Sequence, residues 1–146
     1  MNIEIFQKIV QKWKGENLGI LSPYSEKQIQ NSFDKIGKSV SKDIFQVYLN
    51  VGGLADGKMD SNLLSFWSLE QIVAENLKYK TDFTLFGDFL ISSHLYGYKY
   101  ENENISSVYS DFETGEYLEI SDSVEDFFNL YLTNPVEIGL YQEQIK

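Results

Sequence analysis

The spacing of apolar residues changes once along the chain, near residue 63, and this change restricts the fold more than any other feature. Before it, apolar side chains recur every three or four positions, as in helices that bury one face. Gly15, Gly37 and the pair Gly52-Gly53 follow three such stretches, and glycine commonly ends a helix. The expected inward side chains are Ile5, Phe6, Ile9, Val10 and Trp13 in the first helix, Ile29, Phe33 and Ile36 in the second, and Ile44, Phe45, Tyr48 and Leu49 in the third.

Serine residues mark the expected starts of the helices, because a serine hydroxyl can accept a hydrogen bond from the first helical turn. Ser25 and Gln28 have the spacing of a capping box. The other expected caps are Ser41 for the third helix, Ser68 for a short helix at Leu69–Leu77, and Ser121 or Ser123 for a last helix that ends at Asn134-Pro135.

After residue 63 the pattern is typical of strands. Tyr96, Tyr98 and Tyr100 recur at period two, so they share one face of a strand. The expected strands are 63–67, 83–86, 90–100, 105–112 and 117–120, with a tight hairpin at Glu113-Thr114-Gly115-Glu116. We predict one domain over residues 1–146, of the α+β class, with N-terminal helices packed on an antiparallel β-meander and a C-terminal helix.

Composition excludes several classes of protein. The chain has no cysteine, which removes disulfides, thiol catalysis and cysteine-based metal sites. Its net charge of −10 opposes binding to nucleic acid, because affinity for phosphates comes largely from lysine and arginine. The start lacks the apolar stretch of a signal peptide, and no run approaches the roughly 20 apolar residues that span a bilayer. We expect a cytoplasmic protein that binds neither nucleic acid nor membrane and carries no cofactor.

The negative charge is concentrated in the second part of the chain. Residues 1–50 hold seven lysines and five acidic residues, a net charge of +2, whereas residues 51–146 hold five lysines and seventeen acidic residues, a net charge of −12. Such an asymmetry either steers a basic partner to the protein or keeps the protein in solution, and the sequence leaves both open. The tyrosines likewise suit a core or an interface. The residues predicted to bind a partner are Glu101, Glu103, Asp111, Glu113, Glu116, Tyr96 and Tyr98.

One segment has the spacing of a phosphate-binding loop. Residues 52–58 fit the pattern G-x-x-x-x-G-K, in which backbone amides and a lysine hold phosphates. However, Met59 stands where a magnesium-binding hydroxyl is required, and the preceding segment has helical periodicity. We interpret the segment as a helix end followed by a loop.

Two further groups of residues could carry chemistry. Asp56, Asp60 and Asn62 suggest a calcium loop, but no frame matches the ligand spacing of an EF-hand. His94 is the sole imidazole, and no Gly-x-Ser-x-Gly nucleophile motif accompanies the serines beside it. The sequence therefore does not predict an enzyme.

The order of four short motifs resembles a known family. They are the helix end Phe45–Gly53, the Trp-bearing strand and helix start Phe66–Glu70, the tripeptide Phe86-Gly87-Asp88, and the serine-, acid- and phenylalanine-rich helix start Ser121–Phe128. Over about residues 25 to 132, this order is similar to that of the SUKH superfamily, also called the Smi/Knr type. The chain departs from the family at Asn50-Val51-Gly52-Gly53, where Asn-Gly-Gly is usual, and at Lys42-Asp43, where a proline is usual. The resemblance implies structural roles for Gly52, Gly53 and Trp67.

The resemblance also implies a non-enzymatic function. Bacterial SUKH proteins are largely immunity proteins, which bind and block toxins that are often nucleases or other nucleic-acid-directed enzymes. A cognate toxin of basic charge would suit an acidic chain that inhibits it stoichiometrically. The alternative is an intracellular scaffold or regulatory module that binds other proteins without a toxin partner.

Overall fold

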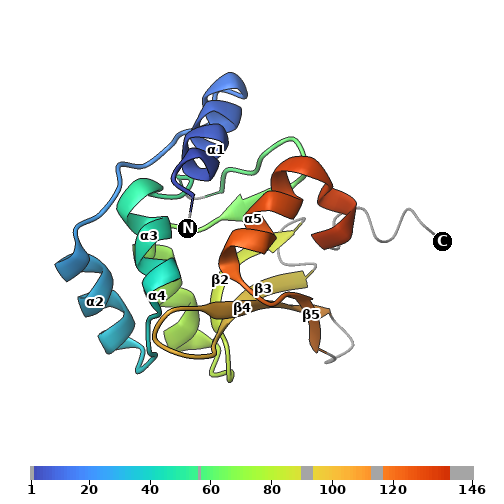
Figure 1. Cartoon of the computed structure of the whole chain (residues 1–146). Coiled ribbons are helices and arrows are strands. Elements are labelled where there is room, and N and C mark those ends of the chain that lie inside the picture. The colour runs from blue at the N-terminus through green and yellow to red at the C-terminus, as the bar shows by residue number, and fades with distance from the viewer. Residues whose placement is uncertain (1, 56, 90–93, 113–116, 139–146) are drawn as a thin grey trace.

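The computed structural model describes residues 2–55, 57–89, 94–112 and 117–138. In this part of the chain the helices are α1 (Glu4–Gly15), α2 (Glu26–Lys35), α3 (Lys42–Asn50), α4 (Leu69–Lys78), α5 (Val124–Thr133) and the short 3₁₀ helix η1 (Pro135–Ile138). The strands are β1 (Leu64–Phe66), β2 (Thr84–Phe89), β3 (His94–Tyr100), β4 (Ser106–Phe112) and β5 (Tyr117–Ser121). The strands form one antiparallel sheet in the order β1-β2-β3-β4-β5 (Figure 1), which confirms the predicted α+β meander.

The predicted caps are confirmed at α2, α4 and α5. Ser25 accepts a hydrogen bond from the backbone N–H of Gln28, and the Gln28 side chain accepts one from Ser25 in return, which completes the capping box. Ser68 and Ser123 each accept from the N–H three residues later. Ser41 precedes α3 but does not cap it, because its hydroxyl is bonded elsewhere in the core.

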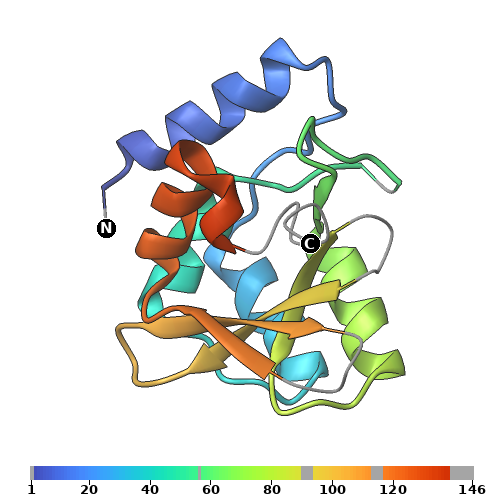
Figure 2. The same cartoon turned by 90° about the vertical axis from the view of Figure 1, so that its right-hand side faces the viewer.

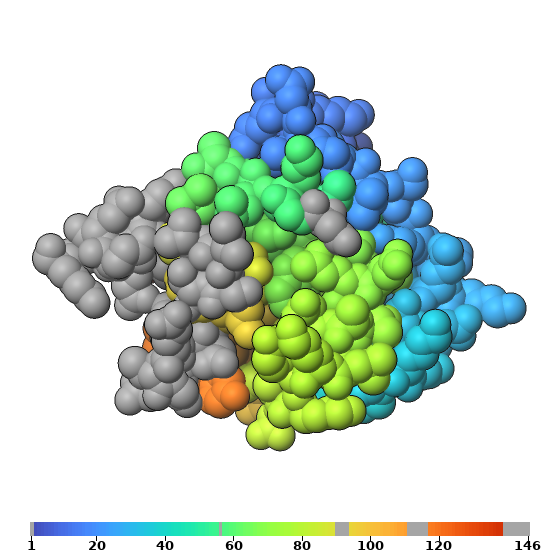
Figure 3. Space-filling model, turned by 180° about the vertical axis from the view of Figure 1, so that it is seen from behind, coloured from blue at the N-terminus to red at the C-terminus, as the bar shows by residue number. Residues whose placement is uncertain are grey.

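Three helices, α1, α3 and α5, form two layers on one face of the sheet, which we call the inner face (Figure 2). α3 and α5 pack directly on the strands: the hydroxyl groups of Tyr48 and Tyr98 lie 3.0 Å apart, and the rings of Phe127 and Phe86 are 5.5 Å apart. α1 lies farther out, so that α5 is between α1 and the sheet (Figure 2). α2 and α4 lie side by side on the back of the molecule (Figure 3). None of the helices in the described ranges combines the length and hydrophobicity needed to cross a membrane.

Phe66 is the centre of the hydrophobic core. Its ring lies 5.7 Å from Trp13 of α1, 5.8 Å from Tyr48 of α3, 5.7 Å from Phe86 of β2 and 5.5 Å from Phe128 of α5. Because aromatic rings bury large areas, these contacts join three helices to the sheet. One phenylalanine on the shortest strand thus connects segments from both ends of the chain.

Gly52 and Gly53 allow the chain to pass between two other backbone segments. A Cβ at Gly52 would lie 2.3 Å from the carbonyl oxygens of Leu21 and Ser22, and a Cβ at Gly53 would lie 2.7 Å from the carbonyl oxygen of Trp67. Gly53 also has a φ of +91°, a conformation that favours glycine. The structure thus gives this pair a role in packing, as the family resemblance implied, and this role accounts for the first glycine of the pattern that resembles a phosphate-binding loop.

We expect Gly52→Ala to destabilise the fold by at least about 3 kcal/mol, because the backbone atoms that the methyl group would meet cannot move without breaking the core. Gly15→Ala is the matched control, since a Cβ there meets nothing within 4 Å. Urea denaturation of both variants measures the difference. Equal stability of the two variants would contradict the packing role of Gly52.

Candidate protein-binding surface

The face of the sheet opposite α3 and α5, here called the outer face, carries a row of three aromatic side chains. The ring of Phe83 lies 5.0 Å from that of Tyr109 on β4 and 4.6 Å from that of Tyr117 on β5. Phe83 can lie there because Gly97 has no side chain: a Cβ at Gly97 would lie 2.7 Å from that of Phe83. Phe83 is 9% exposed, Tyr109 is half-buried and Tyr117 is 47% exposed, so Tyr117 and part of Tyr109 present aromatic surface to solvent.

Carboxylates border this row. Tyr109 donates a hydrogen bond to Glu119 at 3.1 Å, and Glu101 accepts one from the Ser107 hydroxyl at 2.7 Å. Burial, Glu119 and then Glu101 together raise the pKa of Tyr109. The Lys99 ammonium lies 5.6 Å from the centre of the Tyr109 ring. The arrangement joins apolar area to negative charge, which is a combination suited to binding a basic protein.

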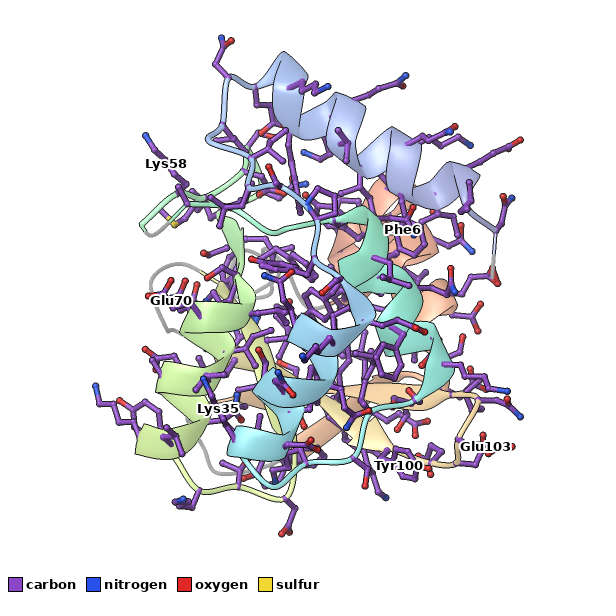
Figure 4. All side chains as sticks on the ribbon, turned by 90° about the vertical axis from the view of Figure 1, so that its left-hand side faces the viewer. Phe6, Lys35, Lys58, Glu70, Tyr100 and Glu103 are labelled. Atoms are coloured by element: carbon purple, nitrogen blue, oxygen red, sulfur yellow. The ribbon has the colours of Figure 1, made fainter. Side chains whose placement is uncertain are left out.

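Of the predicted partner-binding acids, the structure describes the side chains of two. Glu101 lies beside the aromatic row, and Glu103 lies at the exposed tip of the β3–β4 turn (Figure 4). Asp111 lies opposite Tyr117 in the β4–β5 register. The Asp111 side chain and the whole of Glu113 and Glu116 lie outside the described part of the structure.

The prediction that Tyr96 and Tyr98 contact a partner is wrong. Both lie on the inner face with 0% and 2% of their surface exposed, and their rings pack against Phe86. Desolvation raises the pKa of both phenols well above the usual value. On the outer face, the side chains that reach solvent are instead those of Tyr109, Tyr117 and Glu119.

Asp60 is a core residue rather than a calcium ligand. Its carboxylate accepts hydrogen bonds from the backbone N–H groups of Asn62 and Leu64 and from the Tyr131 hydroxyl. The Tyr131 hydroxyl in turn accepts a bond from the Trp13 indole N–H at 2.8 Å. This chain of bonds ties the loop before β1 to α5 and α1. Among the described residues no group of three or more metal-ligating side chains occurs.

Lys12 connects the same network to the surface. Its ammonium lies 3.6 Å from Asp60 and 2.5 Å from Glu16, and Glu16 also accepts a bond from the Ser61 N–H at 2.6 Å. Burial alone would raise the pKa of Glu16, but the bonds from Lys12 and Ser61 outweigh it and lower that pKa. Lys12 therefore compensates two carboxylates in the fold.

Asp43 is a second buried carboxylate with a structural role. It lines a cavity of about 590 Å³ between α3 and the β3–β4 turn, and it accepts bonds from the Ser41 hydroxyl and the Ser106 N–H. Burial raises the pKa of Asp43, although these bonds oppose the rise. Through these bonds Asp43 joins α3 to β4.

The structure also shows where the other residues singled out in the sequence lie. His94 is buried, with its Nε2 3.2 Å from the Tyr96 hydroxyl and its ring stacked on Phe89. Trp67 is buried, as its predicted structural role requires. Lys58 points away from the body of the molecule (Figure 4).

Between α2 and α4 lies a shallow cavity of about 360 Å³, bordered by Lys35 and Glu70. Tyr24 lies at this cavity and donates to the Gly52 carbonyl oxygen at 2.9 Å while accepting from the Leu69 N–H. Burial raises the pKa of Tyr24, which keeps the phenol a donor. Tyr24 thus holds the Gly52 segment against the start of α4.

Comparison with known proteins adds no relative: no family model matches the chain, and no curated protein matches it.

Tyr131→Phe is expected to lower the free energy of unfolding by about 1–3 kcal/mol, because it leaves the buried Trp13 N–H without its acceptor and removes one of the donors to Asp60. Tyr109→Phe removes the same atom at the protein surface and should cost less than about 0.5 kcal/mol. Urea denaturation compares the two. A loss at Tyr109 as large as that at Tyr131 would contradict this account of the network.

Proposed function

We propose that the chain is an immunity protein that binds a basic bacterial toxin and inhibits it stoichiometrically. The observation that carries the proposal is the outer face of the sheet, where the half-buried Tyr109 and the exposed Tyr117 lie near Glu101 and Glu119. The motif order that resembles the SUKH superfamily supports the same function. It also indicates a nuclease or another nucleic-acid-directed enzyme as the target.

The charge of the chain supplies the first step of binding. The net charge of −12 in residues 51–146 attracts a basic domain over about one Debye length, which is close to 8 Å at physiological salt. Steering of this kind raises the association rate more than it raises the final affinity. A toxin that acts on nucleic acid carries positive charge around its active site, so an acidic surface competes for the same groups.

The aromatic row supplies the second step. Tyr109 and Tyr117 offer large apolar areas with few rotatable bonds, and tyrosine is frequent among the residues that dominate binding energy. Their positions are fixed by Phe83 beneath them and by the strands that carry them. Their burial against the toxin would keep the toxin's substrate from its active site.

The direct test is protection of living cells. We expect the chain to restore growth of bacteria that express a basic toxic polypeptide from the gene adjacent to its own. With purified proteins, inhibition should be complete at one chain per toxin. A toxic neighbour that the chain neither binds nor inhibits would contradict the proposal. Specific binding to a protein without toxicity would instead favour the scaffold alternative.

The surface itself is tested by charge reversal. Replacement of Glu101, Glu103 and Glu119 by lysine should slow association with the toxin about tenfold or more and reduce its dependence on salt. The matched control replaces Glu26, Asp34 and Glu70, exposed acids of α2 and α4, and changes the net charge by the same amount. Stopped-flow kinetics at several salt concentrations measure both. Equal slowing by both sets would show that net charge, rather than this surface, guides the toxin.

A further inference from the structure

The two edges of the sheet differ in how their backbone groups are used. At the β1 edge, the Leu54 N–H donates to the Phe66 carbonyl at 2.8 Å, and Asp60 exchanges bonds with both backbone groups of Leu64. These bonds from the preceding loop occupy the edge as a further strand would. Strand addition is therefore blocked on this side.

The protection continues beyond the end of β1. There the Asn76 side chain of α4 accepts a bond from the Leu85 N–H and donates to the Leu85 carbonyl, both at 2.9 Å. An amide side chain thus replaces a neighbouring strand at this point of β2. The fold uses a buried polar residue to close this side of the sheet.

The β5 edge has no such cover among the described residues. The backbone bonds of β5 within that part of the chain are those of its ladder with β4. Alternate backbone groups of a strand point to opposite sides, so part of those in β5 point away from β4. Tyr117 and Leu118, which point to opposite faces of the strand, are 47% and 50% exposed. β5 therefore offers both backbone bonds and apolar side chains.

A groove with an acidic rim adjoins this edge. It has a volume of about 300 Å³ and lies between the end of β5 and α5. Ile120 and Leu130 supply apolar surface, and Asp122 and Asp126 supply exposed carboxylates. Glu119 adds a third exposed carboxylate from β5 itself. Between Glu101 and Gln144 the sequence contains no lysine, so this charge is not compensated by neighbours along the chain.

The acidic residues near β5 favour a basic partner strand at this edge of the sheet. A second copy of this chain, paired through β5, would bring Glu119, Asp122 and Asp126 toward the same carboxylates, on a chain of net charge −10. Like charges across paired strands are destabilising. An extended segment that carries lysine or arginine between apolar residues has the opposite charge and the alternation that a strand requires.

We propose that β5 is a strand-addition site for a basic, extended segment of the partner protein, which joins the sheet as a sixth strand and places a cationic side chain in the groove beside α5. The proposal rests on the proposed function for the nature of the partner, and it specifies how the partner is held. Backbone pairing would give affinity, and the acidic rim would select basic segments.

Synthetic peptides test the proposal without the toxin. An octapeptide in which lysine alternates with valine should shift the amide NMR signals of residues 117–121 of the full chain in a saturable manner. The same peptide with glutamate in place of lysine should not. A lysine peptide that is N-methylated at every second residue should bind at least about tenfold more weakly, because it keeps the charge but loses the N–H groups needed for pairing.

Matched variants of the protein complete the test. Glu119→Lys should weaken binding of the lysine peptide at least about fivefold, whereas Glu26→Lys on α2 should not. Shifts centred away from β5, or equal binding of the N-methylated peptide, would overturn strand addition. Sedimentation should show a monomer, and a dimer that Glu119→Lys alters would overturn the assignment to a foreign segment. Toxin inhibition with no peptide binding would reject this site and leave the proposed function standing.

Discussion

The packing of aromatic rings around Phe66 is the interaction on which the rest of the structure depends. Phe66 contacts residues of α1, α3, β2 and α5, so one side chain joins three helices to the sheet. Interiors packed at crystal-like density transmit small displacements. A change of ring position here would therefore move the helices relative to the strands, and with them the ends of β4 and β5 that carry the outer face.

Two buried carboxylates add hydrogen bonds between the packed elements. Asp60 joins the loop before β1 to α1 and α5, and Asp43 joins α3 to β4. Each is satisfied by donors from the fold, as buried charged groups must be. Negative charge thus has two roles in one molecule. Inside, it is compensated and fixes geometry, whereas on the outer face and at β5 it remains exposed to solvent.

The sequence predicted the order and class of the elements well, because helix caps and apolar periodicity are local signals. Ser25, Ser68 and Ser123 marked helix starts that the structure confirms.

The assignment of Tyr96 and Tyr98 to the surface failed, because tyrosines at period two suit either face of a strand. The alternate set, Leu95, Gly97 and Lys99, contained the missing signal, since glycine and lysine are poor core residues. The aromatic row could not be predicted, because it joins Phe83 to Tyr117 across strands whose register depends on turns and a bulge.

The pleat of β3 and β4 assigns alternate residues to the core and to the surface. Tyr98 and Val108 pair on the inner face, while their chain neighbours Lys99 and Tyr109 point outward. Mutations at the outward positions change the surface with little effect on the core, whereas mutations at the inward positions change the core. Under the proposed function, this separation would let the binding surface change in evolution while the architecture stays constant.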